Sequence, residues 1–366
     1  MVENQKPVYY GDYLELSKLL GTQNPKSLEA GDESHDETLF IIVHQVYELW
    51  FKQILHEMDS AIKIFEQPEI EERQLSTVNA RLQRIIKIQH LLLTQLEVME
   101  TMTPMDFLEF RDLLIPASGF QSVQFREIEV KMGLHTGKRK SVDREYFVGR
   151  LSQKDRDRVE EVEKSSSLFD LLEKWLERIP FTNNPAFDFW AEYKVAVEKL
   201  MKADEDIIKK NLATLGPTQK EVQLDNLNAT QKTFASLFDD KLHKELVASK
   251  KRRLSQKATL NGLFILLYRD EPILNMPYQI LNSLMDIDEN FTTWRYRHAL
   301  MAHRLLGTKI GTGGSSGHHY LKMAAEHNQV YVDLFNLSTF LIPRRDLPKL
   351  PKEVLKTLNF YFNESE

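Results

Sequence analysis

The chain of 366 residues contains no cysteine. This absence excludes disulfides, iron–sulfur clusters, cysteine-ligated zinc and thiolate nucleophiles. It also excludes haem that is ligated by a thiolate or attached through a Cys-x-x-Cys-His motif. Any haem would therefore be held non-covalently, and the 11 histidines are the first candidates for an axial ligand.

Long hydrophobic runs and an excess of one charge are also missing. No apolar run approaches the roughly 20 residues that a membrane-spanning helix needs, and the opening MVENQKPVYY lacks the apolar core of a signal peptide. The net charge of -6, from 48 Lys plus Arg and 54 Asp plus Glu, argues against a nucleic-acid surface. We expect a cytoplasmic protein with neither a nucleic-acid nor a membrane partner.

Helical periodicity dominates the chain, and convincing alternating strands are missing. The sequence therefore predicts an all-α fold: one large helical bundle with an additional helical subregion in the middle of the chain. Thr103-Pro104-Met105-Asp106 is a strong start signal, with Thr as N-cap and Pro at the first helical position. We predict helices over 36–65 and 70–102, one from Thr103 that ends before Pro116, and others near 121–131, 157–178, 187–212, 218–237, 240–250, 273–286, 294–306 and 325–341.

The stretch from Trp294 to Tyr320 combines a histidine-bearing helix with a glycine-rich loop. Its first half has the crowded apolar pattern of a buried helix that carries His298, and Gly307 is a credible end for that helix. Five glycines from Gly307 to Gly317 then allow the backbone to approach a ligand closely. Two simpler interpretations stay open: a flexible connector, and a histidine satisfied within the core. A P-loop is disfavoured, because Lys309 precedes the glycines at 311–317.

A second histidine, His44, lies inside the very apolar stretch FIIVHQVYELWF. Phe40, His44 and Tyr47 share one helix face at spacings of four and seven residues. A buried imidazole needs partners for both ring nitrogens. His44 is therefore either a core residue bonded to a neighbouring carbonyl or part of a binding site.

Arg111 shares a helical stripe with Phe107 and Leu114. A guanidinium facing an apolar pocket suits a carboxylate bound through two parallel hydrogen bonds. The alternative is a structural ion pair with a nearby acidic residue, and the sequence alone leaves both open.

Three of these segments resemble the tryptophan 2,3-dioxygenase family of haem enzymes. They read HDETLFIIVHQVYELWFKQILHEMDS, DFLEFRDLLIPASGFQSVQFR and WRYRHALMAHRLLGTKIGTGGSSGHHYL. The resemblance extends to YYGDYLELSKLL and VYVDLFNLSTFLIPR, and it is clear over about 9–133 and 288–345. It implies that the chain uses O₂ to cleave the indole 2,3-bond of L-tryptophan and releases N-formylkynurenine.

The resemblance implies a role for each part of such a site. His298 would bind the iron of one non-covalent haem b per subunit, with Trp294 also in contact with the haem. His44 would lie on the distal side as the catalytic histidine and accept a hydrogen bond from the indole N–H. Arg111 would bind the tryptophan carboxylate, and Thr312 would help to hold the amino-acid end.

The remaining implied contacts lie on the walls of the pocket and in the N-terminal segment. The apolar walls would be Phe40, Phe107 and Leu114, and the turn over the distal face would hold Ser118 and Gly119. A neighbouring subunit of a homotetramer would donate Tyr10, Tyr13 and Leu14. We accordingly predict an N-terminal segment (1–35) that reaches a neighbouring subunit, a haem- and substrate-binding core (36–135 and 271–366), and an additional helical region (136–270).

Overall fold

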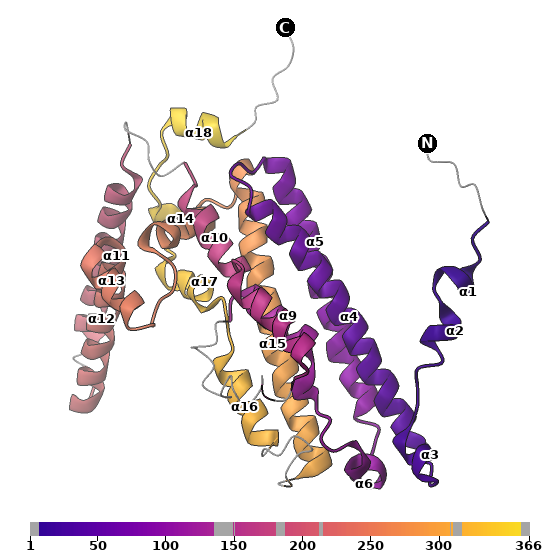
Figure 1. The fold of residues 1–366 in the computed structure, drawn as a ribbon. Helices are drawn as coiled ribbons and strands as arrows, with labels where there is room; N and C mark the ends of the chain where they lie inside the picture. Colours follow the sequence, from indigo (N-terminus) through magenta and orange to yellow (C-terminus); the bar gives the residue numbers. More distant parts are fainter. Residues whose placement is uncertain are drawn as a thin grey trace. The chain divides into compact units, whose positions relative to one another are not determined.

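A computed structural model describes residues 7–134, 149, 151–180, 187–211, 215–307, 309 and 317–359. Every regular element in these ranges is a helix, which confirms the predicted all-α fold (Figure 1). The chain forms two compact units, Met1–His56 with Ile85–Ser165 and Glu289–Gln329, and Glu57–Arg84 with Ser166–Asp288 and Val330–Glu366. The functional division predicted at 36–135, 136–270 and 271–366 remains a prediction.

Three long helices contribute to both units: α4 (His35–Phe65), α5 (Glu72–Met99) and α15 (Pro272–Leu306). In the first unit, Gln95 donates to the Val43 carbonyl at 2.9 Å and Tyr47 donates to the Leu92 carbonyl at 2.8 Å. These contacts pair α4 and α5 in antiparallel directions (Figure 1). Apolar side chains at helical spacing form the contact surface, and Val43 and Leu92 are buried in it.

Short helices complete the first unit. They are α1 (Tyr10–Tyr13), α2 (Leu16–Leu19), α3 (Lys26–Ala30), α6 (Pro104–Phe110), η1 (Arg111–Leu114), η2 (Gly119–Gln121), α7 (Val123–Met132), α9 (Gln153–Lys164) and α16 (Gly317–His327). The predicted start of α6 is confirmed, because the Thr103 side chain accepts from Asp106 N and the Asp106 side chain accepts from Thr103 N.

The second unit holds its own set of helices. They are α10 (Leu168–Glu177), α11 (Phe189–Asn211), α12 (Pro217–Phe238), α13 (Asp240–Ala248), α14 (Gln256–Leu267), α17 (Val332–Asn336), η5 (Leu337–Phe340), η6 (Arg344–Asp346) and α18 (Lys352–Leu358). The packing of α10 against α14 is close: the Asn261 amide donates to the Leu176 carbonyl at 2.7 Å. A Cβ atom added at Gly262 would lie only 3.1 Å from Leu337 Cδ1.

Some predicted helix boundaries were wrong. The helix expected over 157–178 is interrupted, because the buried Ser167 accepts from Asp170 N and starts α10 anew. The helix expected over 325–341 is also two α-helices, with α16 ending at His327. Conversely, the two helices expected over 273–286 and 294–306 are one continuous helix, α15, and its predicted end before Gly307 is confirmed by a φ of 60° at that glycine.

Candidate functional site

His44 lies on α4, and its ring is held by the backbone of its own helix. Nδ1 is 2.6 Å from the carbonyl oxygen of Phe40. A carbonyl can only accept, so Nδ1 carries the proton and Nε2 keeps its lone pair. The site thus presents a hydrogen-bond acceptor of fixed orientation.

The electrostatic surroundings keep this imidazole neutral. The ring remains accessible to solvent, yet the protein around it excludes enough water for burial to lower the pKa of His44 below its ordinary value. The Phe40 hydrogen bond and the Glu48 charge oppose this shift but do not overcome it. An accessible ring with a desolvated environment is what the wall of a concave surface provides.

An aromatic cluster adjoins His44. The Phe40 ring centroid lies 4.1 Å from that of His44, 5.7 Å from that of Phe107 and 5.5 Å from that of Phe110. Phe107 and Phe110 are buried on α6, whereas Phe40 is half-buried. The structure therefore brings the predicted wall residues Phe40 and Phe107 together with His44.

Arg111 and Leu114 follow on η1, directly after α6, and both are half-buried. Arg111 NH1 lies 3.7 Å from Asp112 Oδ1, and the side-chain exposures are 13% and 81%. This distance is too long for a hydrogen bond. The contact between Arg111 and Asp112 is thus a weak one with an exposed neighbour.

The next turn carries Ser118 and Gly119. Ser118 is the N-cap of η2, where its hydroxyl accepts from Phe120 N at 3.4 Å and its own N–H donates to Gln121 Oε1 at 3.1 Å. The turn after η1 is therefore locally ordered by side-chain capping.

His298 on α15 is the second histidine of the site. Its pKa is lowered to about 4, mainly by burial and to a smaller extent by the nearby His44. The two imidazoles of α4 and α15 thus lie within electrostatic reach of each other. Within the described residues no hydrogen bond engages either ring nitrogen of His298, and the ring is neutral at physiological pH.

Trp294 stacks on His298 one helical turn away, with ring centroids 5.2 Å apart and an interplanar angle of 19°. Its indole also contacts Tyr47 at 5.9 Å, Phe51 at 6.4 Å and Phe125 at 5.1 Å. Burial raises the pKa of Tyr47 to about 12, so the hydroxyl that bonds Leu92 stays protonated. Tyr47 was placed on the His44 face from the sequence, whereas the contacts of Phe51 and Phe125 with Trp294 were not predicted.

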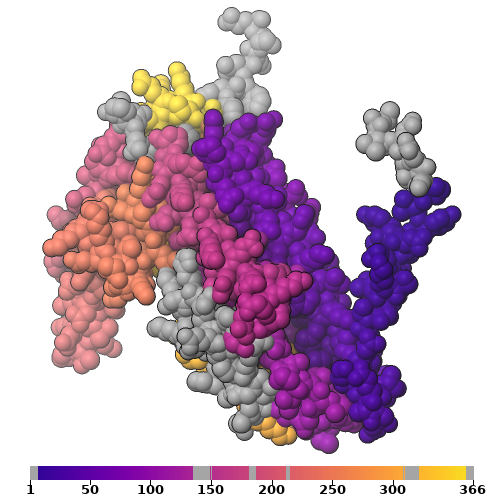
Figure 2. All heavy atoms as spheres, in the orientation of Figure 1, coloured from indigo at the N-terminus to yellow at the C-terminus, as the bar shows by residue number. Residues whose placement is uncertain are grey.

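Three predicted contacts are not brought into this cluster, and a fourth cannot be placed in it or outside it. Thr312 lies outside the described residues. Tyr10, Tyr13 and Leu14 are 75%, 75% and 40% exposed, and the indigo N-terminal helices lie at the surface in Figure 2. None of the described contacts in the first unit joins these three side chains to His44.

The donor set fits a haem whose iron takes one protein ligand. A histidine that binds haem iron must be a neutral imidazole with an available lone pair, and the depressed pKa of His298 keeps it in that form. The adjacent Trp294 supplies an apolar flat surface. His298 and Trp294 could accordingly hold the group.

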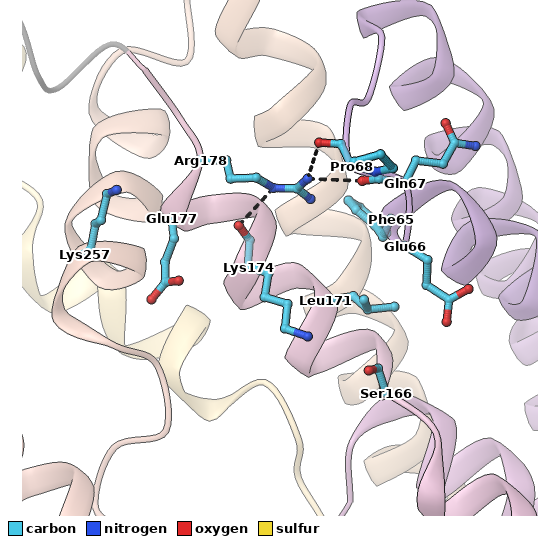
Figure 3. Close-up of a pocket in the computed structure, with 10 residues that line it drawn as sticks. All are labelled: Phe65, Glu66, Gln67, Pro68, Ser166, Leu171, Lys174, Glu177, Arg178 and Lys257. Carbon is cyan, nitrogen blue, oxygen red and sulfur yellow. Dashed lines mark hydrogen bonds between the residues drawn. The ribbon is translucent and has the colours of Figure 1, made fainter.

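A separate hollow of about 580 Å³ lies in the second unit. Arg178 borders it and donates to the carbonyls of Gln67 and Pro68 at 3.1 and 3.0 Å (Figure 3). Lys174 and Glu177 also line it, and none of the predicted site residues does.

Among the described helices, none is long and apolar enough to cross a membrane.

The fold and site define a class: an all-helical protein in which two long helices present neutral histidines beside an aromatic wall and an arginine. A family model described as tryptophan 2,3-dioxygenase matches residues 2–341. The tryptophan 2,3-dioxygenase of Alteromonas mediterranea is 50% identical over 361 residues, which cover 99% of each chain. That of Bdellovibrio bacteriovorus is 49% identical over 356 residues (97% and 99%), and that of Mus musculus is 43% identical over 351 residues (95% and 86%). The chain belongs to the tryptophan 2,3-dioxygenase family.

Proposed function

We propose that this chain uses O₂ to cleave the indole 2,3-bond of L-tryptophan and forms N-formylkynurenine. The family is haem-dependent, and we propose one non-covalent haem b per subunit, held by His298 and flanked by Trp294. The observation that carries the proposal is a pair of histidines on α4 and α15. His44 has Nδ1 bonded to the Phe40 carbonyl beside the aromatic wall, and His298 stacks on Trp294. When bound, the haem supplies an iron with an open position at which O₂ can be activated.

His44 positions the substrate in this proposal. Because Nδ1–H is bonded to the Phe40 carbonyl, the Nε2 lone pair can accept the indole N–H of tryptophan. This hydrogen bond fixes the rotation of the indole within the site and so orients the 2,3-bond for reaction. The indole nitrogen can keep its proton throughout, so His44 need not act as a base.

Arg111 and the aromatic wall bind the two ends of the substrate. The mostly buried guanidinium of Arg111 pairs with the tryptophan carboxylate, and Phe40 and Phe107 pack against the indole. The proposal assigns further substrate contacts to Leu114, Ser118, Gly119 and Thr312. It also includes a cytoplasmic homotetramer in which Tyr10, Tyr13 and Leu14 complete the pocket of a neighbouring subunit.

The test is to reduce the haem-loaded protein and follow N-formylkynurenine formation from L-tryptophan in air. His298→Ala should abolish product and weaken haem retention. The matched control is His303→Ala, which removes an exposed histidine from the same helix and should leave both unchanged. Haem and tryptophan binding without product would indicate a sensor instead, and turnover of D-tryptophan or tryptamine would indicate broader indole specificity. A wild-type protein that retains no haem would refute the proposal.

A further inference from the structure

A buried carboxylate joins three parts of the first unit. Glu129 of α7 accepts from Arg126 NH1 at 2.6 Å through Oε2, and from Arg295 NH2 of α15 at 2.9 Å through Oε1. The Asn328 amide, one residue after α16, also approaches Oε1 at 3.4 Å. Arg295 NH1 in turn donates to the Asn328 carbonyl at 3.3 Å.

Stability alone is a poor reason for this network. Glu129 and Arg295 are 3% and 5% exposed, and removing two such charges from water costs about as much as their attraction returns. Geometry is what the network does specify. Each carboxylate oxygen takes a different arginine, so a slide or rotation of α15 against α7 would break at least one charged hydrogen bond.

The network lies beside the proximal end of the proposed site. Arg295 follows Trp294 directly and precedes His298 by three residues. The guanidinium of Arg295 lies 5.8 Å from the Phe125 ring of α7, and the same ring lies 5.1 Å from that of Trp294. The two helices that Glu129 ties together therefore also hold the indole that stacks on His298.

We propose that Glu129 is a positioning residue for the proximal histidine. By binding Arg295 it fixes the register of α15 on α7, and it thereby sets where Trp294 and His298 lie. This inference rests on the proposed function, in which His298 holds the haem iron.

The chain offers a matched control on the same helix. Glu127, 7% exposed, accepts from Arg158 of α9 at 2.7 and 3.1 Å. Glu127→Gln and Glu129→Gln therefore remove comparable carboxylates from α7, but only Glu129 binds α15. Both variants are loaded with haem and reduced. The iron–imidazole vibration is then measured by resonance Raman spectroscopy, the haem release by transfer to an excess of a haem-scavenging protein, and the Tm by thermal unfolding.

We expect Glu129→Gln to shift the iron–imidazole band and to release haem about tenfold faster, at the low end for groups that orient a metal ligand. Glu127→Gln should lower the Tm while the band and the release rate stay at their wild-type values. Equal spectra and release rates for the two variants would overturn the inference. If Glu129→Gln does not fold, the same measurements are made on Arg295→Lys, because lysine cannot bridge Glu129 and the Asn328 carbonyl in the same way. An unchanged iron–imidazole band in Arg295→Lys would also overturn the inference. A wild-type protein without an iron–imidazole band would refute the proposed function itself.

Discussion

Replacing Arg111 by alanine gives the sharpest test of how the substrate is recognised. The Arg111 side chain is only 13% exposed, so a tryptophan carboxylate bound to it would be largely removed from water. Breaking such a pair by removing one partner costs about 3–5 kcal/mol. That cost corresponds to a loss of roughly 150- to 5,000-fold in tryptophan affinity. Haem content should stay normal.

The assay compares two ligands whose dissociation constants are measured by spectral titration of the haem-loaded protein. Tryptamine keeps the indole and the amine of tryptophan but has no carboxylate. If Arg111 reads the carboxylate, Arg111→Ala should weaken tryptophan binding and leave tryptamine binding within a few-fold of the wild-type value. An equal loss for both ligands would refute the reasoning, because Arg111 would then be supporting the pocket in general.

Asp112→Asn is the control for the alternative that an ion pair with Asp112 holds Arg111 in place. The Asp112 carboxylate is 81% exposed and 3.7 Å from Arg111 NH1. Exposed pairs of this kind contribute about 0–1 kcal/mol. We expect this variant to bind tryptophan and to unfold like the wild type, whereas a loss of binding comparable to that of Arg111→Ala would mean that Asp112 holds Arg111 in place.

Three further predictions concern single groups. His44→Ala should weaken tryptophan binding by about 1 kcal/mol, one hydrogen bond, and keep measurable turnover; near-complete loss of turnover with normal binding would make His44 an obligatory base. Burial lowers the pKa of His243 below 6.5, and its ring bonds Leu254 O and Arg252 at 2.9 Å each. The contribution of neutral His243 to the free energy of unfolding is therefore complete above pH 6.5 and is lost as the pH falls below that value. On acidification, the urea midpoint should decrease less in His243→Gln than in the wild type. Equal decreases in the two proteins would contradict this. Lys250, with φ of 58°, follows Ser249, the C-cap of α13. Lys250→Gly should therefore raise stability by about 1 kcal/mol in thermal unfolding, unlike Ser249→Gly, and no gain would mean that this backbone is unstrained.

Features of the fold that depend on local sequence could be predicted. The helix α6 begins where Thr103, Pro104 and Asp106 indicate, because a capping box needs only residues three positions apart. The face shared by Phe40 and His44 also follows directly from helical spacing.

Features that depend on distant partners could not be predicted. The helix α14 is buried on nearly every side, so its sequence shows no amphipathic period to mark it. The helices predicted over 273–286 and 294–306 form one helix, α15, and Asp288 between these ranges accepts from Val330 N and Tyr331 N at 2.8 Å each. Glu129 and Arg295 are 166 residues apart, and nothing in the spacing of either connects them.

His44 combines an accessible ring with the carbonyl hydrogen bond that a core histidine would need. The hydrogen bond to the Phe40 carbonyl is the satisfied contact expected of a core histidine. The same bond determines which nitrogen carries the proton, because the carbonyl can only accept. With burial keeping the ring neutral, Nε2 can serve only as an acceptor, and tryptophan presents an N–H at the edge of its indole. A local hydrogen bond within the helix thus orients the ring for the substrate. A change that moves the Phe40 carbonyl away from His44 Nδ1 should therefore weaken tryptophan binding, although the His44 side chain itself is unchanged.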